Sequence, residues 1–153
     1  MRLIILSLLF FFSIPSFSQD LMHSDTLSKG EQKMLGIFHF DLNDQKNDIS
    51  VSKKFQSDEA GKAEEKKFWK KTESWVCHLK ENKFYLRAWV ENGALQEETG
   101  TWSFDESSMV LILKSEKEIW EYKVNFNEKG QIWNPLNKGK EEFNMLFLKR
   151  LGL

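Results

Sequence analysis

Apolar and polar positions alternate along most of the chain from residue 34 onward. A period of two is typical of strands that turn one face toward a core. Between residues 118 and 126, for example, Trp120, Tyr122, Val124 and Phe126 fall on one face. The same alternation, bounded by turn residues, predicts about nine strands, near 35–42, 48–56, 75–79, 84–90, 95–104, 109–113, 118–126, 131–133 and 143–148.

The connections between these segments are short and rich in turn residues. Asn92-Gly93 favours a tight two-residue hairpin, because both residues accept a positive φ. Parallel strands would need crossovers of a dozen or more residues, which the spacing excludes. A long antiparallel sheet tends to close on itself, since closure removes its unpaired edges. We therefore expect an all-β fold, an antiparallel up-and-down barrel of about eight to nine strands without a long helix. A two-sheet sandwich is the structural alternative.

Residues 57–72 interrupt the alternation with a charged segment. Ser57-Asp58-Glu59 offers a helix cap, while Gly61 lowers the helix propensity of the residues that follow. We expect one or two helical turns here, and a lid over the mouth of the barrel is one role such an excursion can take.

The N-terminus has the layout of a secretory signal peptide. Arg2 precedes an almost wholly apolar run over 3–12, Pro15 ends that run, and Ser16-Phe17-Ser18 places small residues at a cleavage site. The run is shorter than the roughly 20 residues that span a bilayer. The predicted organisation is a signal peptide over 1–18, a flexible segment over 19–33 and a β-barrel domain over 34–153. We expect export, to the periplasm or out of the cell.

The charge and the cysteine content argue against a nucleic-acid partner and against a lipid or membrane anchor. The net charge is −1, with 22 basic and 23 acidic residues mixed along the chain. A nucleic-acid partner would call for a basic stripe, so we expect none. The single cysteine, Cys77, cannot form an internal disulfide and lies far from the N-terminal apolar run, so no lipid or membrane anchor is expected.

One stretch resembles a known family. From Trp75 to Trp133, an aromatic strand pair is followed by Gly100-Thr101-Trp102, a polar turn and the apolar strand 109–113, and this order is similar to that of the bacterial lipocalin-like domains. Gly36-Ile37-Phe38 stands where those domains carry Gly-x-Trp. The resemblance implies a lipocalin-like barrel of the calycin kind with a ligand cup. It also implies a basic side chain of the last strand, Lys149 or Arg150, above Phe38.

The residues that commonly carry catalysis or bind metals do not converge in this sequence. His39 and His78 fall on polar strand faces, and Cys77 points away from His78 because neighbours on a strand face opposite sides. Zinc needs three or four convergent ligands. The sequence contains neither a Gly-x-Ser-x-Gly motif nor a glycine-rich phosphate loop. We expect a protein that is not an enzyme and has no metal or other cofactor.

The aromatic residues supply the candidate binding sites. The six tryptophans are more than an average chain of this length carries, although large rings also fill the core of a small barrel efficiently. The expected ligand cup would hold a small apolar or amphipathic molecule. It consists of residues at the alternate strand positions that form the apolar face: Phe38, Phe84, Leu86, Trp102, Phe104 and Tyr122. An alternative function is a packed barrel that binds or inhibits another protein through an outer patch. That patch would consist of Tyr85, Arg87 and Trp89.

Overall fold

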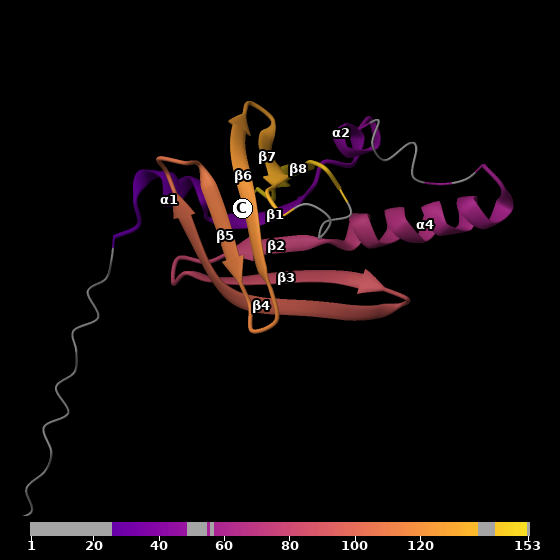
Figure 1. Cartoon of the computed structure of the whole chain (residues 1–153), viewed down its shortest axis with the longest axis horizontal. Coiled ribbons are helices and arrows are strands. Elements are labelled where there is room, and N and C mark those ends of the chain that lie inside the picture. Colours follow the sequence, from indigo (N-terminus) through magenta and orange to yellow (C-terminus); the bar gives the residue numbers. More distant parts are fainter. Residues whose placement is uncertain (1–25, 49–54, 56, 138–142, 153) are drawn as a thin grey trace, which may run out of the picture.

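Eight antiparallel strands close into a barrel in the computed structural model, which describes residues 26–48, 55, 57–137 and 143–152 (Figure 1). Each strand pairs with its sequence neighbours, and β1 pairs with β8 to close the ring. The strands are β1 (Gly36–Phe40), β2 (Val76–Leu79), β3 (Phe84–Glu91), β4 (Ala94–Asp105), β5 (Val110–Lys114), β6 (Ile119–Asn127), β7 (Gly130–Pro135) and β8 (Leu146–Arg150).

The predicted antiparallel up-and-down barrel is therefore confirmed. The strand expected near 48–56 and the signal peptide over 1–18 lie almost wholly outside the described residues, so both stay predictions. The last strand begins at Leu146 rather than at Phe143. Phe143 instead packs its ring against Phe40 and Phe68, with centroids 5.1 and 5.0 Å away.

The middle of the barrel is filled with side chains. Phe38, Trp133 and Tyr122 form a chain of ring contacts across it, with centroid separations of 5.6 and 5.4 Å. Each of these rings is at most 1% exposed. Leu111 and Leu113 from β5 complete the packing. Because large apolar rings occupy the centre, space for a ligand can exist only toward an end of the barrel.

Helix α1 (Lys29–Met34) packs at one end of the barrel. Met34 is fully buried, and the Lys33 carbonyl accepts hydrogen bonds from Gln131 (3.1 Å) and from Arg150. The Arg150 guanidinium lies 5.6 Å from the Phe38 ring centroid. Of the two basic residues considered for the position above Phe38, Arg150 takes it, while Lys149 pairs with Asp41 at 2.7 Å.

Two further helices lie within the described part of the connection between β1 and β2. They are α2 (Leu42–Lys46) and α4 (Glu59–Ser74). The second of these has 16 residues, so the expectation of one or two helical turns and no long helix was wrong. Gly61 does not break it, because its N–H lies in the first turn and donates to the Asp58 cap at 2.7 Å. Strong helix formers then continue to Lys71.

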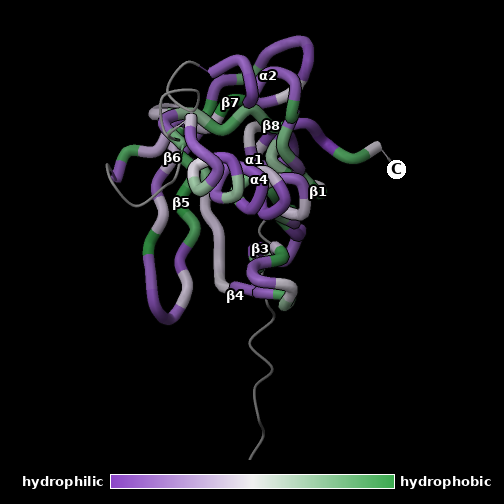
Figure 2. The backbone as a smooth tube through the Cα atoms, turned by 90° about the vertical axis from the view of Figure 1, so that its right-hand side faces the viewer, coloured by the Kyte–Doolittle hydropathy of each residue, from purple (hydrophilic) through white to green (hydrophobic). Residues whose placement is uncertain are grey.

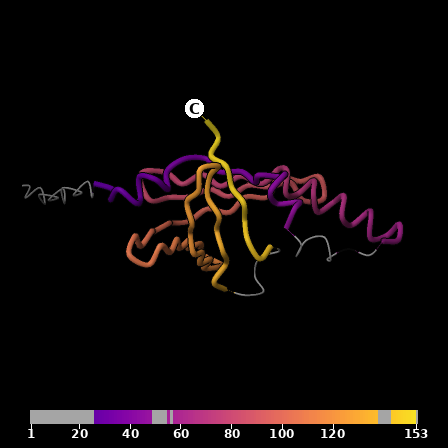
Figure 3. Tube along the Cα trace, turned by 90° about the horizontal axis from the view of Figure 1, so that it is seen from above, coloured from indigo at the N-terminus to yellow at the C-terminus, as the bar shows by residue number. Residues whose placement is uncertain are grey.

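Helix α4 lies on the opposite side of the barrel from α1, along the protruding β3–β4 hairpin (Figures 1 and 3). Most of its residues are hydrophilic (Figure 2). Phe68 and Thr72 are buried on its inner side, whereas most other side chains are exposed. None of the described helices is both long and apolar enough to cross a membrane. The helix thus covers one flank of the hairpin and reaches the rim of the barrel.

Candidate functional site

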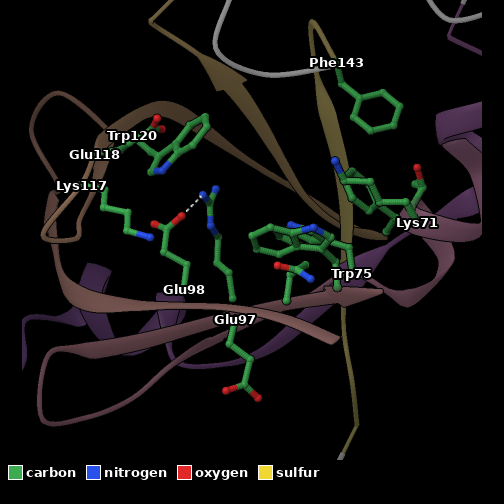
Figure 4. A pocket seen from close by; sticks show the side chains of 13 residues that line it. Lys71, Trp75, Glu97, Glu98, Lys117, Glu118, Trp120 and Phe143 are labelled. Atoms are coloured by element: carbon green, nitrogen blue, oxygen red, sulfur yellow. Dashed lines mark hydrogen bonds and ion pairs between the residues drawn. The ribbon is translucent and has the colours of Figure 1, made fainter. Parts of the chain in front are cut away.

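A cavity of about 410 Å³ opens at the end of the barrel near α4 (Figure 4). It lies where β4 and β5 separate, because their pairing runs only from Thr101 to Asp105 on β4 while β4 itself begins at Ala94. The β3–β4 hairpin and the turn between β5 and β6 therefore form two walls with a gap between them. The end of α4 adds a third wall through Lys71 and Thr72.

Aromatic rings supply the apolar part of the lining. Trp120 faces Phe143 across the cavity, and Trp75 lies near the centre of the view (Figure 4). Phe40 packs beneath them against Trp75, with ring centroids 4.9 Å apart. Trp89, which is half-buried on β3, completes this group. Five rings from five segments of the chain thus meet at one end of the barrel.

A buried ion pair forms the polar part of the same cavity. Arg87 Nη2 lies 2.7 Å from Glu98 Oε2, and their side chains are only 6% and 19% exposed. The two residues face each other directly across the β3–β4 ladder. Arg87 also donates to the Tyr122 hydroxyl at 3.2 Å, and Tyr85 donates to the second Glu98 oxygen. Each oxygen of the carboxylate therefore has a donor, as a buried charge requires.

The guanidinium of Arg87 also stacks on an aromatic wall. Its central carbon lies 4.3 Å from the Trp120 ring centroid. A cation held over an indole face in a partly dry site is stabilised by about 1–2 kcal/mol. Together the ion pair and the stacking hold Arg87 in one position at the floor of the cavity.

Burial and hydrogen bonding act in opposite directions on the Glu98 carboxyl. Burial by itself raises the pKa of Glu98, but the hydrogen bond from Tyr85 and the positive charge of Arg87 outweigh it, so that the pKa is lowered. Burial and the neighbouring carboxylate both raise the pKa of Tyr85 above its ordinary value of 10.0. At neutral pH the cavity therefore holds an ionised Glu98, which accepts from a protonated Tyr85 behind it.

The rim of the cavity carries further charges. Lys71 pairs with Glu91 at 3.0 Å and lies 6.0 Å from the Trp89 ring centroid. Lys117 and Glu118, from the β5–β6 turn, are exposed beside the opening. The rim thus offers charges of both signs to a ligand that enters.

The residues predicted for a ligand cup do not line this cavity. Phe38, Trp102, Phe104 and Tyr122 point into the barrel, as expected, but each is at most 7% exposed. Trp102 lies toward the α1 end, where its indole donates to the Lys80 carbonyl at 2.9 Å. Of the four, Tyr122 comes nearest to the site, through its hydrogen bond with Arg87.

The expected orientation of β3 was wrong. Phe84 is 53% exposed and Leu86 faces outward with it, whereas Tyr85 and Arg87 are buried and point inward. Directly opposed residues of paired strands share a face, and Arg87 lies opposite Cys77, which is fully buried. The register with β2 thus decides which face of β3 is inside.

The expected outer patch is consequently absent as a surface feature. Tyr85, Arg87 and Trp89 belong to the inner face, and the last two line the cavity. Sequence reasoning missed Trp75, Trp120 and Phe143 as site residues, although Trp120 was placed on one strand face with Tyr122 and Val124. Their convergence depends on strand ends that meet only when the barrel closes.

Neither of the described histidines lines this cavity. His39 and His78 lie on the outer face of β1 and β2, where His78 pairs with Ile37 and His39 with Val76. Within the described ranges no three His, Cys, Asp or Glu side chains are grouped to hold a metal. The cavity instead offers aromatic walls and a fixed ion pair, an arrangement suited to binding.

Comparisons with known proteins return no match for this chain among family models, curated proteins or solved structures.

Proposed function

We propose that this protein is a non-catalytic barrel that binds a small amphipathic molecule in the cavity beside Trp120. The observation that carries the proposal is the joint presence of five aromatic rings and a buried Arg87–Glu98 pair around one space of about 410 Å³. Pockets for small molecules are usually about 300–1,000 Å³, mostly apolar, with a few placed polar groups.

The cations already stacked on two of the cavity's aromatic rings favour a neutral or anionic ligand over a cationic one. The Trp120 face already lies against Arg87, and Lys71 lies over the Trp89 face. A ligand cation would therefore have to displace a resident one. An apolar or flat ligand body fits between Trp120 and Phe143, with its polar end toward Lys117 at the rim.

Two further parts of the proposal rest on the sequence. The order of motifs from Trp75 to Trp133 supports membership in the bacterial lipocalin-like domains, and the closed up-and-down barrel agrees with it. The N-terminal apolar run supports export to the periplasm or beyond. In this proposal the ligand is met outside the cytoplasm.

Native mass spectrometry of the protein incubated with a lipid and metabolite extract tests the ligand. We expect a discrete added mass on the wild-type protein that is lost in Trp120→Leu and in Trp89→Leu. Phe84→Leu is the matched control, because this ring is 53% exposed on the outer face and should leave the adduct unchanged.

The circular dichroism spectrum of each variant must match that of the wild type for the comparison to count. Bare protein in every extract would refute the proposal. An adduct that survives both cavity variants would place the ligand elsewhere.

One observation favours the alternative, a packed barrel that acts on another protein. The centre of the barrel is filled, and the outer face of β3 exposes Phe84 beside the half-buried Leu86. These two residues replace the inward-pointing trio as the candidate contact surface. If the alternative holds, Phe84→Leu weakens partner binding and the extracts yield no adduct.

A further inference from the structure

The protruding β3–β4 hairpin has one satisfied edge and one open edge. On the β3 side, Ala88 pairs with β2, and the Val90 N–H donates to the Ser74 hydroxyl of α4 at 2.8 Å. On the β4 side, pairing with β5 begins only at Thr101. From Ala94 to Gly100, no described residue pairs with the outer edge of β4.

The hairpin turn fixes which backbone groups face that open edge. Asn92 and Gly93 have φ values of 52° and 82°, as the two-residue type I′ turn requires, so Glu91 and Ala94 form a hydrogen-bonded pair. Hydrogen-bonded and non-bonded pairs then alternate along the ladder. Counted from Glu91 and Ala94, this alternation makes Lys83 and Trp102 a hydrogen-bonded pair. The Trp102 N–H indeed donates to the Lys83 carbonyl, at 2.7 Å.

Three residues therefore direct their N–H and C=O groups away from β3. They are Leu95, Glu97 and Thr99. Their side chains lie on the outer face, where all three are exposed, Leu95 to 63%. The exposed carboxylate of Glu97 points away from the cavity (Figure 4). An unpaired row of this kind is a template for another extended segment.

The geometry points to an extended peptide of a partner protein, with a basic residue opposite Glu97, as the segment that pairs with β4. An antiparallel second copy centred on Glu97 would oppose two glutamates, and like charges directly opposite are destabilising. A lysine or arginine at that position reverses the sign of the interaction.

The same register assigns the neighbouring side chains of the peptide. Residues next to the basic one would lie on the inner face beside Gln96 and Glu98, where the cavity opens toward Trp120. Aromatic residues fit there. The recognised pattern is thus aromatic, basic, aromatic in an extended chain. The pairing itself depends on the backbone register alone, whereas the two aromatic side chains of the peptide would share the cavity with the proposed small molecule.

Amide hydrogen exchange measured by NMR tests the pairing, with the capped peptide acetyl-Thr-Trp-Lys-Trp-Val-amide as probe. We expect saturable binding and slower exchange at Leu95, Glu97 and Thr99, at least tenfold at saturation. The amides of Gln96 and Glu98, which already bond to β3, should change much less.

Two controls separate strand pairing from other binding. A peptide with N-methyl groups on the residues whose N–H groups face β4 should lose this protection. Glu97→Lys in the protein should weaken binding of the lysine peptide about fivefold and strengthen that of the glutamate-for-lysine peptide, in line with a change of about 1 kcal/mol.

Absence of protection at millimolar peptide would overturn the inference, as would protection without the alternation. Protection that grows with protein concentration in the absence of peptide, with a dimer in sedimentation, would also overturn it by assigning the edge to a second copy.

Discussion

At the scale of single residues, the Arg87–Glu98 pair is a buried ion pair whose charges are compensated by several specific contacts. Both side chains lie inside the barrel, and both are fixed by more than one contact. Removing one member of such a pair leaves an uncompensated charge, which costs more than the pair itself contributes. The Arg87–Glu98 pair therefore affects the stability of the fold as well as the shape of the cavity.

Glu98→Gln is expected to lower the free energy of unfolding by about 2–3 kcal/mol at pH 7, since Arg87 loses its counter-charge. The pKa of Glu98 is lower in the folded protein than its usual value of 4.5, so the folded state binds fewer protons. The contribution is complete above that value and is lost as the pH falls through the folded pKa. The difference between variant and wild type should thus shrink below pH 4.5 in urea unfolding.

The control for this experiment is Glu97→Gln, whose carboxylate is exposed and points away from the cavity. It should stay within about 0.5 kcal/mol of the wild type. If both substitutions lowered the free energy of unfolding equally at pH 7, Glu98 would not be the stabilising counter-charge of Arg87.

Gly100 marks the place where β4 and β5 first meet. A Cβ at this position would lie 2.1 Å from the Lys114 carbonyl oxygen, and backbone cannot yield as a flexible side chain can. We expect Gly100→Ala to destabilise the protein by about 3 kcal/mol in urea unfolding, because the strands must separate locally. Thr101→Ala, on the exposed neighbouring residue, should cost less than 1 kcal/mol. Similar losses of unfolding free energy in the two variants would show that the backbone at Gly100 does not approach the Lys114 carbonyl closely.

At the scale of elements, helix α4 and the β3–β4 hairpin support each other. The hairpin extends past the end of β2, where an isolated two-stranded ribbon would be marginally stable. Helix α4 contributes the Ser74 hydroxyl to the Val90 N–H and Lys71 to Glu91. The length of the helix thus has a structural consequence, because its last turn stabilises the wall of the cavity.

Ser74→Ala is expected to speed the amide exchange of Val90 at least tenfold, since this N–H loses its acceptor. Exchange at Trp102, deep in the barrel, should not change. The free energy of unfolding should fall by no more than about 1 kcal/mol. Ser103→Ala, on the exposed face of β4, serves as the control. Unchanged exchange at Val90 would mean that α4 does not hold the hairpin.

At the scale of the whole molecule, the two ends of the closed barrel differ: one is packed with side chains and the other contains the cavity. The α1 end is packed by Met34, Trp102 and Arg150, whereas the α4 end keeps the cavity. A filled centre separates them. The proposed binding site nevertheless shares Phe40, Trp75 and Phe143 with the core, so its shape depends on core packing.

The Cys77 thiol reports on opening of the whole barrel. It is fully buried and makes no disulfide. Labelling by a thiol reagent should be at least about a thousandfold slower in the native protein than in urea, since reaction requires unfolding of several kcal/mol. The labelling rate should rise with urea concentration in parallel with the change in tryptophan fluorescence that reports unfolding. Rapid labelling without denaturant would contradict a closed barrel around β2.

The alternation of apolar and polar residues was sufficient to predict antiparallel strands, short turns and closure, because a period of two and tight connections leave few other folds. The alternation could not orient β3, where both faces carry large side chains and only the pairing of Arg87 with Cys77 selects the inner one.

The candidate site depended still more on tertiary structure. Arg87 and Glu98 are eleven positions apart, and Trp75, Trp120 and Phe143 belong to separate segments. The sequence by itself determined the eight described strands of the barrel and their order, since those follow from local periodicity and turn chemistry, but it did not predict helices α1 and α2 or the length of α4. Tertiary structure alone decided which strand ends meet, because closure and register depend on contacts between residues distant in the chain.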